Sequence, residues 1–419
     1  MASGVTFRTR KSMRPSFFYG WVMLGVAGVC YSFGISPVFY GWGIFVLSMT
    51  EDLGIDRSDV GGVFGFFNVM SQGVSVIVGV GIARLGLRPI MAVGFLVTSL
   101  GMLYLVGAES AVDCYVGFSL LGGIGVGMST IIPCQTLAQN WFLRRRALAI
   151  AFVFTAGAIV GLLVPATGLY IVSHADWREG WLVIAGVSGI LSVIAVLFVI
   201  DRPEKIGQTL DGDSSSVPVT KISEWSALQA IKTRQFALLV GCGVAYTATW
   251  SALVPHLALH FDDMGYSMGM AGAFISVMVL LSSIGRLIGA VGDWLPPQYV
   301  LAVALAIEGL GAGMVLAADN AIFASLAVAF VGLGFGVAYV SVPVVFSFFF
   351  GRNAFAVTSG LRLTVTAAFS GLGPWVSGEF FDATGAYTIP FLGLMVIGLG
   401  GAVCAGSLKH PGSPSILST

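Results

Sequence analysis

Residues 123–133 read GIGVGMSTIIP, and residues 332–343 read GLGFGVAYVSVP. Each stretch has three glycines at alternate positions and ends in a proline, and the first glycines lie 209 residues apart. A spacing of 209 or 210 residues also joins two further pairs: Pro165 with Pro374, and Gly79 with Gly289. Because this spacing is half of the 419-residue chain, the pattern predicts two similar halves.

The composition outside these stretches is that of a membrane protein. Hydrophobic residues make up 57% of the chain and charged residues only 10%, against roughly 25% in an ordinary soluble domain. The mean hydropathy is +0.93, and 20 basic residues balance 20 acidic ones. Polar surface is too scarce to cover a water-exposed body, so the composition excludes a soluble globular protein, a disordered chain and a nucleic-acid binder.

Twelve apolar runs are long enough to cross a bilayer as helices, which takes ~20 residues each. The first run, from about residue 17, is too long for a signal peptide and predicts a retained span. One long polar break, with the solvated sequence DGDSSS at 211–216, separates six runs from six. The chain is therefore predicted to be an all-α membrane protein with an N-terminal tail (1–16), a six-helix bundle (17–200), a linker (201–233), a second six-helix bundle (234–408) and a C-terminal tail (409–419).

The basic residues predict the orientation. Sixteen of the 20 lie at the run ends that share a side with the linker, and only Arg57 and Arg178 lie at the other ends. Since basic residues concentrate on the cytoplasmic side, we expect a multi-pass cell-membrane protein with both termini in the cytoplasm.

Metal and cofactor chemistry is not indicated. The five cysteines are irregularly spaced, form no CxxC pair and fit small core residues, and no HExxH accompanies the four histidines. We therefore expect no metal site, no catalytic residues and no cofactor. An integral membrane enzyme is a distant alternative, because clustered nucleophiles or metal ligands are lacking.

Two arginines lie inside apolar runs, where an ionised side chain costs at least ~2.5–3.5 kcal/mol and needs a partner or a wet cavity. The guanidinium of Arg286 could bind a substrate carboxylate through two parallel hydrogen bonds, or it could pair with Asp293 or a helix end. Arg362 could be a second anion contact or a funnel for incoming anions, or it could extend to the interface. Glu308, also in an apolar run, fits a partnered or neutral structural acid better than a proton relay.

Four short motifs resemble those of the major facilitator superfamily, and in particular its monocarboxylate porter branch with the bacterial relatives of that branch. They are FYGWV at 18–22, GVGIARLGLR at 79–88, WFLRRRALA at 141–149, and Gly373-Pro374 followed by FDATG at 381–385. The resemblance covers nearly the whole chain and implies the major facilitator fold, two six-helix bundles around a central site.

The resemblance also implies roles for individual residues. The first, fourth, seventh and tenth helices line the site in this fold, which makes His256, Tyr339, Tyr40 and Tyr246 candidate substrate contacts, each of which also fits plain core packing. The eighth-helix arginine of the family binds the anion, and Arg286 matches it. On the second helix, Asn68 is a further candidate contact that interhelical hydrogen bonding explains equally well.

The gate residues follow from the loop motif at 79–88. Arg84 and Arg88 match its basic positions, but Ala83 stands where the family has an acid. The repeat partner of that position is Asp293, so only the second half can lock the inner gate through an acid at a helix terminus. Arg362, near the cytoplasmic side of its helix, is assigned to the same gate.

The function predicted is secondary active transport, by alternating access, of a small organic anion, namely a monocarboxylate such as lactate or pyruvate. Proton symport is the coupling that the family implies. However, an aspartate one turn before the family arginine is Ser282 here, and a first-helix lysine of the animal members is Tyr40. Organic-anion exchange or drug efflux are the alternatives. The expected partners are the anion, a co-transported proton and membrane lipids, without nucleic acid. No protein partner is indicated.

Overall fold

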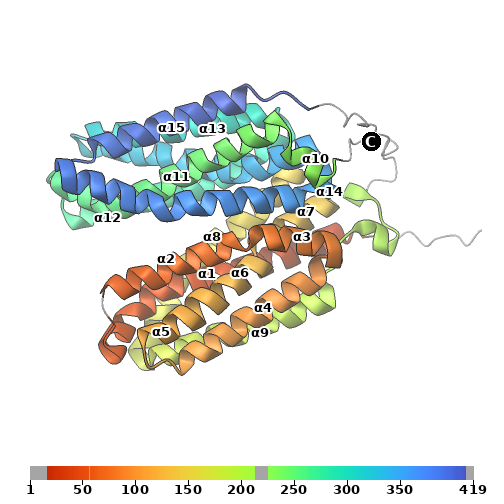
Figure 1. Cartoon of the computed structure of the whole chain (residues 1–419), viewed down its shortest axis with the longest axis horizontal. Coiled ribbons are helices and arrows are strands. Elements are labelled where there is room, and N and C mark those ends of the chain that lie inside the picture. Colours follow the sequence, from red (N-terminus) through yellow and green to blue (C-terminus); the bar gives the residue numbers. More distant parts are fainter. Residues whose placement is uncertain (1–16, 56, 213–224, 412–419) are drawn as a thin grey trace, which may run out of the picture.

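The computed structural model describes residues 17–55, 57–212 and 225–411, and the predicted tail 1–16 lies outside these ranges. The first half contains α1 (Gly20–Leu53), α2 (Arg57–Gly73), α3 (Ser75–Leu85), α4 (Leu87–Val106), α5 (Ala111–Cys114), the π-helix η1 (Tyr115–Gly122), α6 (Gly123–Ser129), α7 (Ile131–Trp141), α8 (Arg146–His174) and α9 (Trp177–Phe198). The linker holds η2 (Pro203–Ile206), η3 (Leu210–Gly212) and α10 (Ala227–Ile231). The second half contains α11 (Arg234–Asp263), α12 (Met268–Ile288), η4 (Gly289–Asp293), α13 (Pro297–Met314), η5 (Val315–Ala317), α14 (Ala321–Thr384) and α15 (Thr388–Gly406). Figure 1 shows the halves as two bundles lying side by side.

Eleven helical segments in the described residues are long and apolar enough to cross a membrane. One of them, α14, has 64 residues, which at 1.5 Å per residue is about three times the thickness of a bilayer core. Gly351 interrupts it with φ 72° and ψ 178°, a conformation that a residue with a side chain rarely adopts. The helix therefore contains two crossings joined at Gly351, and the predicted all-helical fold of twelve crossings is confirmed.

The glycine rows of the repeat are close-contact sites in both halves. A Cβ at Gly123 or Gly127 would collide with α2, and one at Gly125 with α4. In the second half, a Cβ at Gly332 or Gly336 would collide with α12, and one at Gly334 with α13. The fourth crossing of each half thus packs backbone to backbone against the second and third crossings. The sequence repeat is a repeat of these helix contacts.

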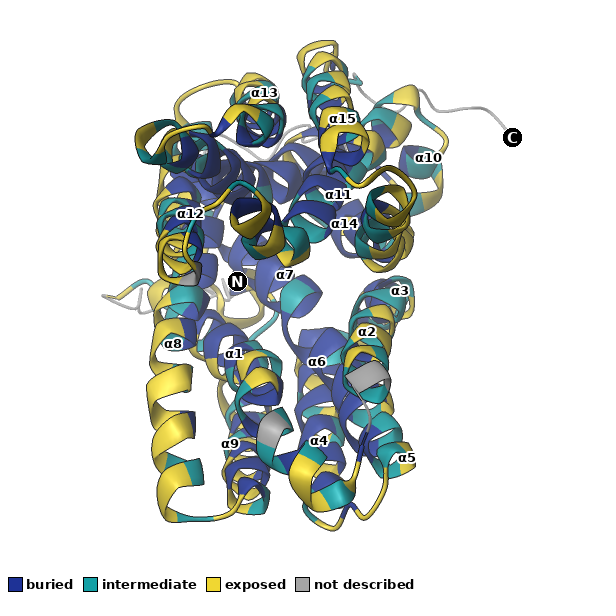
Figure 2. Ribbon diagram, turned by 90° about the vertical axis from the view of Figure 1, so that its left-hand side faces the viewer, coloured by how far each residue is buried: buried dark blue, intermediate teal, exposed yellow. Residues whose placement is uncertain are grey.

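The hydrophobic core differs between the two ends of the molecule. On the linker side, the core of the first half includes residues of the second half, namely Ala290, Val340, Val344, Ala356 and Leu363. On the opposite side, the cluster around Trp42 and Trp181 belongs to the first half alone, and the cluster around Phe261 and Phe391 to the second half alone. The two bundles are therefore joined at the linker side, and their cores remain separate at the other end, which Figure 2 views.

Candidate functional site

An aromatic cluster joins the two halves near the middle of the spans. The Tyr31 hydroxyl of α1 lies 3.2 Å from the Tyr339 hydroxyl of α14, in the opposite half. The Tyr339 ring also packs against Phe154 of α8, with ring centroids 4.5 Å apart. Tyr31 and Phe154 come from the first half, so the cluster is complete only when the bundles meet.

Arg286 of α12 lies at this cluster. Its guanidinium carbon is 5.2 Å from the centroid of the Tyr339 ring, within cation–π range. Its Nη1 donates to the backbone carbonyl of Phe154 at 3.2 Å, and its Nε is buried without a partner. Among the described residues, Asp293 does not form an ion pair with Arg286. The guanidinium therefore keeps donor capacity for a group that the described protein atoms do not supply.

Arg362 of α14 lies beside Tyr246 of α11, a third tyrosine next to this cluster. Its side chain is only 1% exposed and therefore does not extend to the membrane surface in this conformation. Its Nη1 donates to the Tyr246 hydroxyl of α11 at 3.1 Å, and its Nε is buried without a partner. The Tyr246 and Tyr339 rings are 6.3 Å apart, which connects Arg362 to the cluster that holds Arg286.

Four of the candidate residues thus come together: Arg286, Tyr339, Tyr246 and Arg362. They supply two cationic forks and two hydroxyls amid apolar side chains, where a low dielectric strengthens attraction to an anion. Chemically this group can hold carboxylate oxygens and offers no described carboxylate that could balance a cation.

His256 of α11 lies elsewhere, ten residues or about 15 Å along the helix from Tyr246. Its Nδ1 lies 3.2 Å from the Tyr387 hydroxyl and its Nε2 lies 2.9 Å from the carbonyl of Pro374. Both ring nitrogens are therefore occupied within the second half, where they fasten α11 to the proline of α14.

Replacing His256 by alanine should lower the melting temperature of the protein and leave substrate affinity within about twofold, because the side chain contacts helices and not the arginine cluster. Thermal unfolding and equilibrium binding of a carboxylate, measured on one preparation, check both expectations. A large loss of affinity with unchanged stability would instead place His256 at the substrate.

Tyr40 and Asn68 also lie apart from the arginines. Tyr40 of α1 is 43% exposed and packs against Phe39, with ring centroids 5.4 Å apart. Asn68 of α2 donates its side-chain N–H to the Phe64 carbonyl of its own helix at 2.9 Å. Glu308 of α13 is 1% exposed and both of its carboxylate oxygens lack a hydrogen-bond partner.

Asp293 lies at the linker side and contacts the opposite half. Its two carboxylate oxygens accept the backbone N–H groups of Ala147 at 2.7 Å and Leu148 at 2.9 Å, at the start of α8 in the other half. Free amides and the positive end of the helix dipole favour a carboxylate there. The acid that the sequence assigned to a helix terminus is therefore found at one, and the contact crosses between the halves.

The two arginines of the loop motif lie in different surroundings: Arg88 makes a contact within the first half, and Arg84 lies at the interface between the halves. The Nε of Arg88 donates to the Val199 carbonyl at 2.9 Å, a contact within the first half. Arg84 lines a cavity of about 400 Å³ at the interface together with Arg202, Arg352 and Asn353. The cavity wall is fastened by Arg202, whose Nη2 donates to Asn353 Oδ1 at 3.2 Å.

Helices α3 and α14 are in close contact next to this cavity, whose lining includes Ala356 of α14. A Cβ at Gly79 would collide with the Ala356 carbonyl, and one at Gly360 would collide with the Ser75 carbonyl. Beside them, the Thr364 hydroxyl donates to the Gly73 carbonyl at 3.1 Å and accepts the Val76 N–H at 3.2 Å. At this contact the two halves pack backbone to backbone on the linker side.

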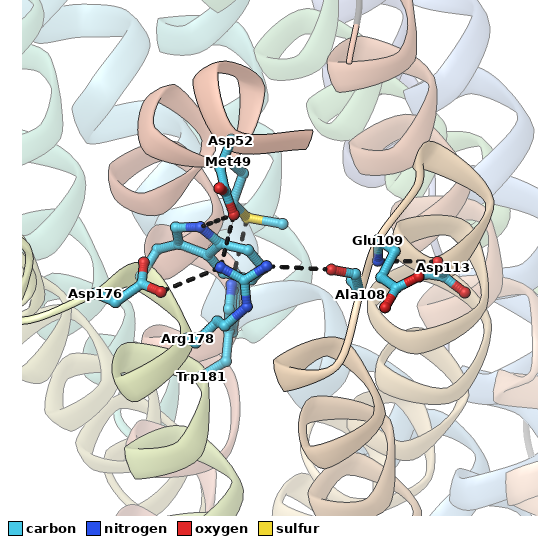
Figure 3. Close-up of polar contacts among 9 residues, drawn as sticks. Met49, Asp52, Ala108, Glu109, Asp113, Asp176, Arg178 and Trp181 are labelled. Atoms are coloured by element: carbon cyan, nitrogen blue, oxygen red, sulfur yellow. Dashed lines mark hydrogen bonds and ion pairs between the residues drawn. The ribbon is translucent and has the colours of Figure 1, made fainter. Parts of the chain in front are cut away.

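The loops at the opposite end are fastened within the first half, as Figure 3 shows. Arg178 donates to Asp52 at 2.6 Å and to Asp176 at 3.1 Å, and reaches the Ala108 carbonyl at 3.5 Å. Trp177 donates its indole N–H to Asp52 as well, at 3.3 Å. These contacts connect three loops of one bundle and make no bridge to the other.

The hydrogen bond from Arg178 lowers the pKa of Asp52 below its usual value of about 3.9. A depressed carboxyl pKa stabilises the fold above the unfolded-state pKa, and this contribution is lost as the pH falls through the folded-state pKa. Arg178→Gln should therefore lower the melting temperature slightly at pH 7, and the difference from the wild type should shrink as the pH falls below about 4 and vanish below the folded-state pKa of Asp52. Melting curves over this pH range check it, with Lys232→Gln as the control. A difference that is independent of pH would contradict the ion-pair origin.

Sequence reasoning missed three residues of these sites. Tyr31 completes the tyrosine pair, but in the sequence it is one tyrosine among several in apolar runs. Asp201 accepts the N–H groups of Leu87 and Arg88 at 3.2 and 3.3 Å, and Asp211 accepts that of Arg144 at 2.9 Å. Both acids contact the start of a helix that is distant in the sequence, so the residues around them give no sign of the contact.

Paired bundles of membrane-crossing helices, an interface with buried arginines and closure at one end define a membrane transport protein. The sequence signature described as the Major Facilitator Superfamily matches residues 22–374, and the chain belongs to this superfamily.

Individual relatives agree with this assignment. The chain is 26% identical to monocarboxylate transporter 11 of Homo sapiens over 96% of its own length and 84% of that protein. It is 23% identical to monocarboxylate transporter 4 of Mus musculus over 95% and 86% of the two lengths. The solved structure of the E. coli fucose:proton symporter FucP superposes with a TM-score of 0.68 at 15% identity and covers 91% of this chain and 98% of its own. The chain is therefore a transporter related to monocarboxylate transporters.

Proposed function

We propose that the protein carries a small organic anion, a monocarboxylate such as lactate or pyruvate, across the cell membrane by alternating access. The observation that supports this most directly is Arg286, whose buried Nε lacks a partner beside the hydroxyls of Tyr339 and Tyr31. A carboxylate placed there accepts two parallel N–H bonds from the guanidinium, and the hydroxyls orient it. The names of the relatives support the same substrate class.

The two halves supply the gates. We assign the linker-side gate to two contacts between the halves, that of Asp293 with the start of α8 and the glycine contact of α3 with α14. We place this side in the cytoplasm, because the basic residues concentrate there. Rocking of one bundle against the other then breaks these contacts and exposes the arginine cluster to the inside.

Uptake of labelled lactate and pyruvate into proteoliposomes tests this function. Protein-dependent uptake that unlabelled carboxylates compete away supports it. Uptake confined to sugars, amines or drugs would overturn the substrate class.

Anion exchange is the second candidate, and one feature favours it over proton symport. Among the described residues, no carboxylate pairs with Arg286, and Ser282 occupies the position one turn before it. The described part of the chain therefore offers no carboxylate that could carry a proton in exchange with this arginine. Exchange predicts that carboxylate trapped inside the vesicles accelerates uptake. Symport predicts that a proton gradient directed inward, with the outside acidic, accelerates uptake into vesicles that contain no carboxylate.

A further inference from the structure

Arg362 is a buried cation that the proposed monocarboxylate does not use. It is 1% exposed, donates one hydrogen bond to Tyr246, and leaves its Nε buried and unpartnered. Helix α11 lies close to its alkyl chain, since a Cβ at Gly243 would be 2.9 Å from the Arg362 Cδ. A glycine at this position leaves the space that the arginine side chain occupies.

No acid of the described residues balances Arg362. It forms no ion pair with any described carboxylate, and Glu308, the buried acid of α13, has no hydrogen-bond partner on either oxygen. A neutral hydroxyl is the only described partner of this guanidinium. A charge kept in a low-dielectric site without a counter-charge favours the conformation or the ligand that supplies one.

The two unbalanced guanidiniums flank one pair of tyrosines. Arg286 lies over the Tyr339 ring at 5.2 Å, the Tyr339 and Tyr246 rings are 6.3 Å apart, and the Tyr246 hydroxyl accepts from Arg362. One carboxylate compensates one of these charges and leaves the other uncompensated.

We infer that the site is built for a dianion, a short dicarboxylate whose first carboxylate binds Arg286 and whose second binds Arg362 beside Tyr246. This inference rests on the proposed function, because it keeps Arg286 as the anchor for one carboxylate. It extends the proposed substrate class from monoacids to short diacids, and it assigns Tyr246 as the residue that orients the second carboxylate.

Equilibrium binding to the purified full-length protein tests the inference with matched ligands. Succinate and glutarate are compared with their monomethyl esters, which have the same chain but one charge. The diacids should bind at least roughly tenfold more tightly than the esters, because the second carboxylate gains a charge-assisted contact. Equal affinities, or tighter binding of the esters, would overturn the dianion site.

Variants separate this inference from the proposed function. Arg362→Gln should abolish the difference in affinity between diacid and ester, whereas Arg362→Lys should retain part of it. Tyr246→Phe keeps the ring and should reduce the same difference. If Arg362→Gln weakens ester and diacid equally, the second subsite is wrong and the anion site at Arg286 stands. If neither ligand binds the wild-type protein, the dianion site is wrong, and lactate binding to the same preparation decides separately whether the anion site at Arg286 stands. The wild-type comparison decides the question even if a variant does not fold.

Discussion

Replacing Arg286 by glutamine should weaken carboxylate binding by roughly a hundredfold. Glutamine keeps much of the length of the side chain but removes the charge and the fork that hold a carboxylate. Hydrogen bonds to charged groups contribute about 1.5–3 kcal/mol each, and the upper end of this range corresponds to the expected loss. Titration of the purified protein with lactate, followed by ligand-induced thermal stabilisation, measures it.

Two comparisons make this result specific. Arg286→Lys retains the charge without the planar fork, so its affinity should lie between those of the wild type and the glutamine variant. Lys409→Gln removes a charge on the linker side, distant from the arginine cluster, and should bind as the wild type does. Unchanged lactate binding in a folded Arg286→Gln protein would remove the anchor on which the transport proposal depends.

Gly79→Ala should shift the protein away from the conformation described here. The added Cβ collides with the Ala356 carbonyl, which belongs to the backbone and cannot move aside as a flexible side chain does. Overpacking of this kind costs about 1–3 kcal/mol. That cost applies only while α3 and α14 touch, so it should change the ratio of closed to open linker sides by a factor of roughly 5 to 150.

Spin-label distances across the linker side measure this shift. Labels at Leu85→Cys and Leu295→Cys, both exposed and in opposite halves, should move apart in the Gly79→Ala protein. Gly65→Ala is the matched control, because it lies in the same membrane span and nothing approaches its Cβ within 4 Å. Alanine otherwise favours a helix over glycine, so an effect at Gly79 alone isolates the contact with α14. Identical distances in both variants would show that this contact does not control the gate.

The two predictions concern different steps of one cycle. The first removes the group that the anion binds, and the second leaves that group intact while it biases the gate. The Arg286→Gln protein should fail to transport because it no longer binds the anion, whereas the Gly79→Ala protein should still bind it. Measuring affinity and label distance on both variants therefore distinguishes a lost site from a displaced equilibrium.

Much of the fold could be predicted because its signals are local. A crossing helix requires ~20 consecutive apolar residues, and these runs are visible in the sequence without knowledge of any neighbour. The glycine rows at 123–127 and 332–336 likewise mark close contacts wherever the partner helix lies, since only a residue without a side chain permits them. Hydropathy and glycine spacing thus specified the crossings and their twofold repetition.

The site was predicted in part, since charge inside an apolar run is also a local signal. It identified Arg286 and Arg362, but it could not say that both flank the same tyrosine pair. It also could not distinguish Tyr339, which meets Tyr31 across the halves, from Tyr40, which does not lie at the arginines.

Apolar length and glycine position are properties of the chain, and they established a membrane protein of two similar bundles before any fold was known. The partner of each polar side chain depends instead on how helices from distant parts of the chain rotate and cross. That arrangement paired Asp293 with the start of α8, occupied both nitrogens of His256, and buried Arg362 beside Tyr246. These pairs join residues about 100 positions apart or more, so no local pattern encodes them.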